Sequence, residues 1–413
     1  MEQVVVTGIG TVNPLGNTVS QFWENIREGK SGAGPITRFD TTGYTTTYAA
    51  EVKDFDPRER IDKREARKMD RFSHYAVYAS IEALEDAGLN RGDGSYDSDR
   101  TGVILGVGIG GFETMEESIR ALAEKGPGRV PPMTIPKLIA NIGPAHVAIH
   151  MDAHGPVYSL ATACASGTDA IHNAARAIRA GECDVVVTGG VEASITPLGV
   201  SGFNVIQALS SKYAEDPTKA SRPFDKDRDG FLMGEGAGIL VLESRSHAEK
   251  RGARIYAEVA GSSMTCDANH LTAPHPEGRG AIQAMEKAIK AAGVAPTEID
   301  YINAHGTSTP INDPTETKAI KAVFGDYAGK LKISSTKSMT GHCIGAAGGI
   351  EAVVVVLALR DQYFPATINL DNPDPECDLN YLPNKGLSGE MNVAMSNTFG
   401  FGGHNGVVVL RRV

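Results

Sequence analysis

Two hydrophobic patterns alternate along the chain: short apolar runs typical of buried strands, and longer stretches with helical spacing. In the first part, strands are expected at 3–7, 102–107, 157–162, 184–190 and 238–243, with a helix over 165–180. In the second part, strands are expected at 254–261, 299–304, 331–334, 392–396 and 406–411, with helices over 280–292, 313–324 and 345–360. This alternation predicts an α/β protein with mixed, largely parallel sheets and helices on their faces.

The two series indicate an internal duplication, with halves at about 1–252 and 253–413. The best-matched pieces are TACASGTDAI from Thr162 and TGHCIGAAGGI from Thr340, both unusually rich in small residues. Gly lowers helix propensity, a cost that is tolerable where two helices must approach closely. We therefore expect these helices to meet at the centre of the molecule. The insertion from Glu113 to His154 is expected to form a helical cap.

Composition excludes several classes of protein. The 413 residues are 41% hydrophobic and 22% charged, which is ordinary for a globular protein, and the net charge of −10 argues against general nucleic-acid binding. The longest apolar run, 352–359, is far short of the ~18 residues of a membrane span and predicts a buried helix. No secretory signal is visible, and the five cysteines show no C-x-x-C spacing, so a reducing cytoplasm is expected rather than disulfides or zinc.

Two motifs imitate ligand sites. Gly106–Gly111 (GVGIGG) matches the dinucleotide pattern, but a loop follows where a second strand with a ribose-binding acid is required, so NAD is rejected. Asp225–Gly230 (DKDRDG) resembles the start of a calcium loop, but the twelfth loop position is Gly236 and a strand follows. We interpret this second segment as a turn-rich loop.

A basic run, Arg58 to Arg71, departs from the acidic balance of the chain. At helical spacing, Arg64, Arg67, Lys68 and Arg71 would share one face. The residues alone favour a solvated helix face. The alternative is a docking surface for an acidic partner.

Cys164 lies between an expected strand and an expected helix. A helix N-terminus stabilises an anion, so we expect it to lower the pKa of this thiol and make it nucleophilic. The other reading, a buried structural cysteine, is adopted for Cys183, Cys266 and Cys377.

Two histidines lie at comparable boundaries. His305 (in NAHGTST) follows the strand expected at 299–304, and His342 (in SSTKSMTGH) precedes the second small-residue helix, five residues after Lys337. Each alone is more often structural, but together with Cys164 they indicate a site. The glycine-rich segment 398–406 (TFGFGGHNG) is either an oxyanion-binding turn or a tight turn between strands.

With these motifs in order, nearly the whole chain resembles the elongating β-ketoacyl-acyl-carrier-protein synthases, nearest to the synthase II type of bacterial fatty-acid synthesis. The resemblance implies a thiolase-like fold, with duplicated halves in αβαβα layers, and a homodimer. It implies that Cys164 carries the acyl chain and that the backbone N–H groups of Cys164 and Phe401 hold the oxyanion. His305 and His342 would stabilise the enolate formed by malonyl decarboxylation, and Lys337, with Glu351, would tune the site.

The resemblance also implies binding residues. Thr272, Thr307 and Thr309 would contact the phosphopantetheine arm, and Ile109, Phe203 and Phe401 would form the acyl pocket and its gate. Acyl-carrier protein would dock on Arg64, Arg67 and Lys68, which reverses the preference for a solvated face. No organic cofactor and no catalytic metal are implied; a structural monovalent cation would lie near Asn303, Glu351, Ser396 and Asn397. Cys343 and His404 depart from the commonest family pattern.

Other functions remain as alternatives. A polyketide ketosynthase uses the same residues and is the nearest enzyme alternative; we expect it less because no fused acyltransferase or carrier domain is expected from this sequence. A non-catalytic chain-length factor would lack the nucleophile. The starter-type synthase III uses His and Asn, and a degradative thiolase carries a second cysteine in its C-terminal glycine loop. A cysteine protease needs only Cys and His, so it leaves the second histidine and Lys337 unexplained.

Overall fold

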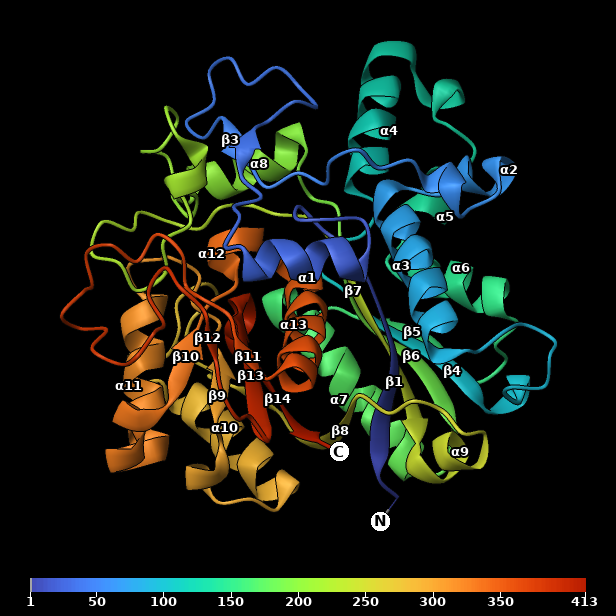
Figure 1. Ribbon diagram of the computed structural model, residues 1–413. Helices are drawn as coiled ribbons and strands as arrows, with labels where there is room; N and C mark the ends of the chain where they lie inside the picture. The colour runs from blue at the N-terminus through green and yellow to red at the C-terminus, as the bar shows by residue number, and fades with distance from the viewer. Residues whose placement is uncertain (1) are drawn as a thin grey trace.

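The sheet at the centre of the molecule contains ten strands joined by hydrogen bonds (Figure 1). The computed structural model describes residues 2–413, and Met1 lies outside the described residues. The strands of this sheet are β1 Val4–Val12, β4 Thr101–Val107, β5 Val157–Leu160, β6 Val185–Glu192, β7 Gly236–Ser244, β8 Ala257–Cys266, β9 Tyr301–Asn303, β10 Lys332–Ser334, β13 Val393–Gly400 and β14 His404–Arg412. Two small sheets pair β2 Gly34–Pro35 with β3 Tyr48–Ala49, and β11 Tyr363–Phe364 with β12 Leu387–Ser388.

The helices form three layers around the two halves of this sheet (Figure 1). They are α1 Val19–Arg27, α2 Lys63–Ala66, α3 Arg71–Ala87, α4 Phe112–Lys125, α5 Thr134–Leu138, α6 Ile142–Met151, α7 Ser166–Arg179, α8 Pro197–Val205, α9 Arg245–Lys250, α10 Arg279–Ala292, α11 Asn312–Phe324, α12 Lys337–Thr340 and α13 Ala347–Asp361. Helices α7 and α13 contact strands of both halves, whereas α3 and α6 cover one outer face and α10 and α11 the other. The result is the αβαβα arrangement of a thiolase-like fold.

The strand order repeats within the sheet. From its outer edge inward, the first half reads β5-β4-β6-β7-β1 and the second reads β10-β9-β13-β14-β8. In each half the first two contacts are parallel and the last two are antiparallel. The halves join where β1 pairs with β8, through Val5 with Glu258 and Val6 with Ala257. The chain boundary between residues 252 and 253 stays a prediction.

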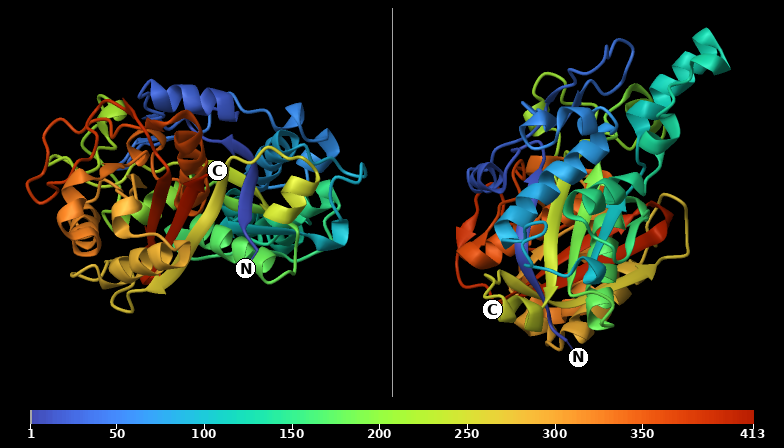
Figure 2. Two further views of the ribbon diagram at one scale, coloured as in Figure 1. Left: turned by 60° about the horizontal axis from the view of Figure 1, so that its bottom comes forward. Right: turned by 90° about the vertical axis from the view of Figure 1, so that its right-hand side faces the viewer.

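The expected helical cap divides into two parts. Helix α4 projects from the body, as the right-hand view of Figure 2 shows, and α5 contacts it. Helix α6 instead packs on β4 and β5 and buries Val147 and Met151. It occupies the position in the first half that α11 occupies in the second, so the cap prediction is wrong for this helix.

Other departures from the expected elements have local causes. The strand expected at 254–261 is β8, 257–266, because its pairing with β14 continues as far as Cys266. Helix α3 was not expected; it begins after Asp70, whose side chain accepts a hydrogen bond from Phe72 N. Because α2 ends at Ala66, the residues from 58 to 71 do not form one helix, and the single helical face predicted there is wrong.

Small residues allow α7 and α13 to touch at the centre. A Cβ atom added at Gly348 would lie 2.3 Å from Thr168 Oγ1 and 2.5 Å from Thr168 N. The predicted close approach of these helices is therefore confirmed. Each helix follows a 3₁₀ turn whose first residue has a positive φ, 50° at Ala163 and 47° at Ile344. When the two turns are aligned, Gly345 corresponds to Cys164. The sequence alignment from Thr162 and Thr340 had instead paired Cys164 with His342, three residues earlier.

Within residues 2–413, no helix combines the length and the apolar character needed to cross a bilayer.

We expect Gly348→Ala to destabilise the protein by about 1–3 kcal/mol, because the new methyl group would overlap Thr168 and force the central helices apart. The loss should occur although alanine favours helix over glycine by about 1 kcal/mol. Gly202→Ala in α8 is the matched control, since its Cβ would meet nothing within 4 Å. Urea unfolding followed by circular dichroism measures both. Equal stability of the two variants would contradict the proposed constraint.

Candidate active site

Cys164 lies in the 3₁₀ turn Ala163–Ala165, between β5 and α7. The positive φ of Ala163 is costly for a residue with a side chain, so neighbouring contacts must hold it. Ser166 supplies two of them: its Oγ accepts from Thr162 N at 2.9 Å and donates to Ala163 O at 2.6 Å. The turn places Cys164 Sγ 2.9 Å from His342 Nε2.

His342 is held by backbone and aromatic contacts. Its N–H donates to Leu232 O at 2.7 Å, and its carbonyl accepts from Gly234 N at 2.9 Å. The ring of Phe231 meets the imidazole edge-on, with centroids 5.2 Å apart. The backbone of the first half therefore fixes an imidazole of the second half against Cys164 of the first.

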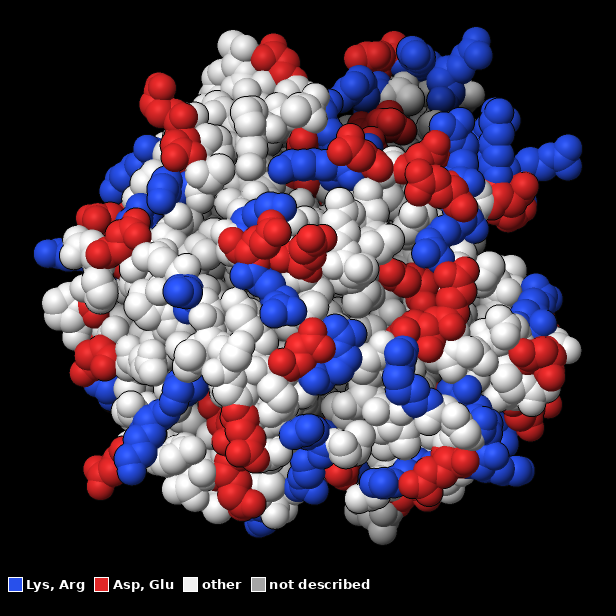
Figure 3. Space-filling model, viewed as in Figure 1, with Lys and Arg blue, Asp and Glu red and all other residues white. Residues whose placement is uncertain are grey.

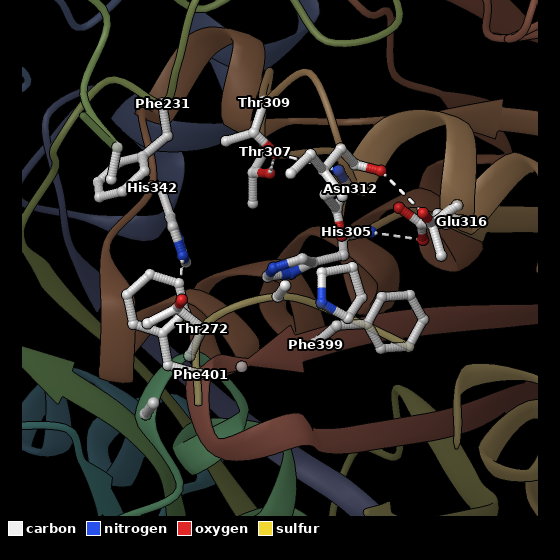
Figure 4. A pocket seen from close by; sticks show the side chains of 18 of the residues that line it. Phe231, Thr272, His305, Thr307, Thr309, Asn312, Glu316, His342, Phe399 and Phe401 are labelled. Atoms are coloured by element: carbon white, nitrogen blue, oxygen red, sulfur yellow. Dashed lines mark hydrogen bonds between the residues drawn. The ribbon is translucent and has the colours of Figure 1, made fainter. Parts of the chain in front are cut away.

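His305 follows β9 and faces His342 across the cavity (Figure 4). The two ring centroids are 5.3 Å apart and the planes are nearly perpendicular. The loop that carries His305 is fixed by Glu316 on α11, which accepts from His305 N at 2.9 Å and from Gly306 N at 2.8 Å. Cys164, His305 and His342 thus lie together, as the sequence motifs predicted.

Lys337 lies behind the cavity rather than in its lining. Its Nζ forms an ion pair with Glu351, and the two side chains are only 1% and 2% exposed. The expected Lys337–Glu351 pair is therefore present. A buried pair of this kind leaves a strong local field, because little solvent is available to screen it.

Burial and this field keep both imidazoles neutral. Burial, assisted by the positive charge of Lys337, lowers the pKa of His305 and of His342 well below the usual value. A neutral imidazole has one ring N–H to donate and one nitrogen to accept a proton. The pair is therefore suited to hydrogen bonding with a carbonyl oxygen.

The thiol of Cys164 does not follow the prediction made from the helix N-terminus. Burial raises its pKa to about 12, and the opposing effects of Lys337 and of the Phe401 backbone N–H do not compensate. The expected lowering of this pKa is therefore wrong: desolvation outweighs the positive groups. The resting thiol is protonated, and His342 Nε2 is placed to receive its proton.

The glycine-rich turn after β13 approaches the backbone of Cys164. A Cβ atom at Gly400 would lie only 3.0 Å from Cys164 N, and Gly402 and Gly403 have φ values of 84° and 75°. The Phe401 N–H faces the sulfur of Cys164. The glycine-rich turn therefore brings the Phe401 N–H to the sulfur and passes close to the backbone nitrogen of Cys164.

A cavity of about 520 Å³ joins these groups. All the residues that the resemblance assigned to catalysis, acyl binding or pantetheine binding line it, except Lys337. They are Cys164, His305, His342, Phe401, Thr272, Thr307, Thr309, Ile109 and Phe203. Thr307 and Thr309 lie side by side, with their hydroxyl oxygens 2.9 Å apart.

Sequence reasoning missed three side chains that shape the site: Glu316, Phe231 and Phe399. Glu316 left a usable signal, because it shares the buried face of α11 with Ile320 four residues later. An acid on the apolar face of a helix needs buried partners. The two aromatic residues carry no comparable signal.

The basic residues Arg64, Arg67 and Lys68 are exposed on and just after α2, away from the cavity lining. Figure 3 shows Lys and Arg side chains gathered over this part of the surface. Lys68 pairs with Glu65 at 2.7 Å, whereas Arg64 and Arg67 form no ion pair with any described residue. Arg71 lies apart from them and pairs with Glu113 at 3.0 Å.

The calcium-like segment at 225–230 is held by the protein itself. The Asp225 carboxylate accepts from Arg222 Nε at 2.9 Å and from the backbone N–H groups of Asp227, Asp371 and Asn372. Asp229 Oδ2 accepts from the backbone N–H groups of Ser211 and Lys212. The segment is a loop whose carboxylates organise neighbouring turns.

The fold and the site together define the class of protein: a thiolase-fold condensing enzyme. Comparison with known families narrows this class. The family described as "Beta-ketoacyl synthase, N-terminal domain" matches residues 1–248, and "Beta-ketoacyl synthase, C-terminal domain" matches residues 256–371. The chain belongs to the β-ketoacyl synthase family.

Relatives support this assignment over the whole length. A protein named 3-oxoacyl-[acyl-carrier-protein] synthase 2 from Synechocystis sp. is 50% identical over 100% of this chain and 98% of its own length. Proteins of the same name from Coxiella burnetii and Staphylococcus aureus are 49% and 48% identical, with coverage of 100% of this chain and 99% and 98% of their own.

Solved structures give the same fold. A type II polyketide ketosynthase in complex with its acyl-carrier protein has a TM-score of 0.92 at 36% identity, covering 100% of this chain and 99% of that one. A β-ketoacyl synthase from Burkholderia phymatum has a TM-score of 0.93 at 34% identity, with full coverage of both chains.

We expect Lys337→Met to slow alkylation of Cys164 by iodoacetamide, because loss of the positive charge raises the pKa of the thiol further. One pKa unit corresponds to about tenfold in thiolate fraction, so we expect a fall of about tenfold at neutral pH. Peptide mass spectrometry of Cys164 over a pH series measures the rate.

Lys212→Met removes an exposed lysine and is the control for a general charge effect. The double variant Lys337→Met/Glu351→Gln removes both charges of the buried pair, and its Cys164 should also be alkylated slowly. This variant distinguishes loss of the positive charge of Lys337 from the effect of a Glu351 left without its partner. Unchanged alkylation of Cys164 in both Lys337 variants would contradict the electrostatic role.

Proposed function

We propose that this enzyme elongates fatty acyl chains by decarboxylative condensation of a malonyl thioester with an acyl group held on Cys164, both delivered by acyl-carrier protein. The observation that carries the proposal is the 2.9 Å contact between Cys164 Sγ and His342 Nε2, with His305 facing His342 in the same cavity. The product is a 3-oxoacyl thioester two carbons longer, together with carbon dioxide.

In the first half-reaction, the thiol proton of Cys164 moves toward His342 Nε2 while the sulfur attacks the acyl thioester. The backbone N–H groups of Cys164 and Phe401 stabilise the negative oxygen of the intermediate. The carrier sulfur leaves with the proton. Burial keeps the resting thiol protonated, so proton transfer must accompany attack.

In the second half-reaction, His305 and His342 donate their ring N–H groups to the thioester carbonyl of the malonyl group, with neutral His342 now in the tautomer that carries its proton on Nε2. The bond to the carboxylate breaks, carbon dioxide leaves, and the electron pair enters the enolate. Its carbon then attacks the acyl carbonyl on Cys164, and the cysteine sulfur leaves as a thiolate that takes up one proton from solvent, the proton that the overall reaction consumes. Neutral imidazoles suit this role, because an enolate oxygen gains most from donors fixed in a dry site.

We assign the remaining lining residues by the same resemblance. Thr272, Thr307 and Thr309 bind the phosphopantetheine arm, and Ile109, Phe203 and Phe401 bound the acyl chain. All six line the cavity that contains Cys164, which supports their assignment to substrate binding. Ser396 Oγ, Asn397 Oδ1 and Glu351 Oε2 are buried oxygens without hydrogen-bond partners among the described residues, which fits the monovalent cation expected near Asn303.

Surface features support the proposed binding partners. We assign carrier-protein docking to Arg64, Arg67 and Lys68, supported by the two guanidinium groups left without an ion pair. A homodimer is supported by β5, which hydrogen-bonds to β4 alone among the described strands and leaves one edge open, with Tyr158 36% exposed. A cytoplasmic location is supported by the five cysteines, all of them unpaired.

Polyketide synthesis is the second candidate, because solved neighbours include ketosynthases of that class at 36% identity. The full-length relatives at 48–50% identity, named for 3-oxoacyl-carrier-protein synthesis, favour fatty-acid elongation. The chain-length factor is disfavoured by Cys164, and a cysteine protease by the second histidine.

The deciding experiment incubates the enzyme with malonyl-carrier protein and a series of acyl-carrier proteins, and reads products by mass. We expect one two-carbon extension per turnover, and no acyl adduct or extension with Cys164→Ala. An adduct on another residue of that variant would contradict the assignment. His305→Ala and His342→Ala should lose malonyl decarboxylation more than acylation of Cys164, whereas equal loss of both half-reactions would argue against the enolate role.

Charge reversal tests docking. We expect Arg67→Glu with Lys68→Glu to raise KM for acyl-carrier protein by roughly tenfold at low salt, with a smaller effect as salt screens the contact. Rates with a small acyl-pantetheine thioester should not change, since it lacks the acidic protein. Lys290→Glu, an exposed residue of α10, is the matched control. An unchanged KM would restore the interpretation of a solvated surface.

A further inference from the structure

The dinucleotide-like turn, Gly106–Gly111, binds a carboxylate of the protein itself. Glu192, the last residue of β6, is fully buried, and its Oε2 accepts from Gly345 N at 3.3 Å. The backbone N–H groups of Ile109 and Gly110 face the same carboxylate. A Cβ atom at Gly108 would lie 2.2 Å from Oε2, so this glycine is required for the approach. The N–H groups of this turn are therefore occupied by the carboxylate of Glu192.

The internal duplication accounts for the position of the hydrogen bond between Gly345 N and Glu192. Gly345 is the counterpart of Cys164, and each stands in the 3₁₀ turn before a central helix. In one half that turn presents the thiol to the cavity, and in the other it donates a backbone hydrogen bond to Glu192. Glu192 thus joins β6, the turn that carries Ile109, and the start of α13.

The segments that donate to Glu192 also form part of the cavity wall. Ile109 and Ile344 line it together with Cys164. The second oxygen of Glu192, Oε1, has no hydrogen-bond partner within residues 2–413. The Ser194 hydroxyl also faces the carboxylate, whose backbone partners belong to the cavity wall rather than to the side chains of the reaction centre.

We propose that Glu192 is a positioning residue for the acyl pocket: it fixes the turn that carries Ile109 and so determines which acyl chain lengths are accepted by Cys164. The proposal rests on the function given above. Loss of the carboxylate leaves buried N–H groups unpaired, and the turn must move to satisfy them. A displacement of about 1 Å in a binding wall is enough to change rates by about 10²-fold.

The test compares acylation of Cys164 by carrier proteins bearing acyl chains of about 4 and about 14 carbons. We expect Glu192→Ala to change the ratio of the two kcat/KM values by at least about tenfold, since only the longer chain reaches past Ile109. Glu192→Gln should stay within about threefold of the wild-type ratio. Its amide oxygen can replace Oε2, and its NH₂ group can take the place of the partnerless Oε1.

A second variant reaches the same contact from the other side. Gly108→Ala should also change the ratio, because its methyl group would displace the Glu192 carboxylate. In the Glu192→Ala/Gly108→Ala double variant the two effects should be non-additive. Gly108→Ala keeps the test decisive if Glu192→Ala does not fold. Glu243→Gln, at an equally buried carboxylate on β7, is the control for stability and should leave the ratio unchanged.

Several outcomes would overturn the proposal: equal loss for both chain lengths, additive effects in the double variant, or a Glu192→Gln enzyme as altered as Glu192→Ala. Failure of the wild-type enzyme to form an acyl-Cys164 adduct would instead contradict the proposed function itself.

Discussion

The close crossing of α7 and α13 is the constraint on which the rest of the structure depends. Backbone meets backbone where Gly348 packs on Thr168, and each helix start also rests on the strands of the first half. Because the two helices begin at this crossing, the turns before them share the centre of the molecule. Cys164 and His342, 178 residues apart in sequence, come into contact for that reason.

The charge arrangement of the site follows from the same burial. Burial keeps the thiol protonated and the imidazoles neutral, while the Lys337–Glu351 pair supplies a fixed field nearby. A protonated thiol is a poor target for oxidants, which react with thiolates. The arrangement therefore protects Cys164 between turnovers and delays its activation until a thioester is bound.

The sequence predicted most strands, the duplication and the residues that meet in the cavity, because each of these has a local signature. Strands appear as apolar runs, and Cys164, His305 and His342 stand at boundaries marked by glycine. The pKa of Cys164 was predicted in the wrong direction, because burial depends on the whole fold. Glu192 was missed for a related reason: a carboxylate held by backbone N–H groups resembles any surface acid until its partners are placed. Glu316 differs, because its position on the apolar face of α11 with Ile320 was a signal that the sequence carried.

The position of β1 has a consequence for synthesis in the cell. This strand hydrogen-bonds to β7, pairing Val4 with Ser244, and no neighbour earlier in the chain is available to it. The ribosome must add 244 − 4 = 240 residues before that partner exists. At about 5–20 residues per second, the wait is about 12–48 s. An apolar strand thus remains without its sheet neighbours while about 240 further residues are made, an interval in which a nascent chain needs protection from aggregation.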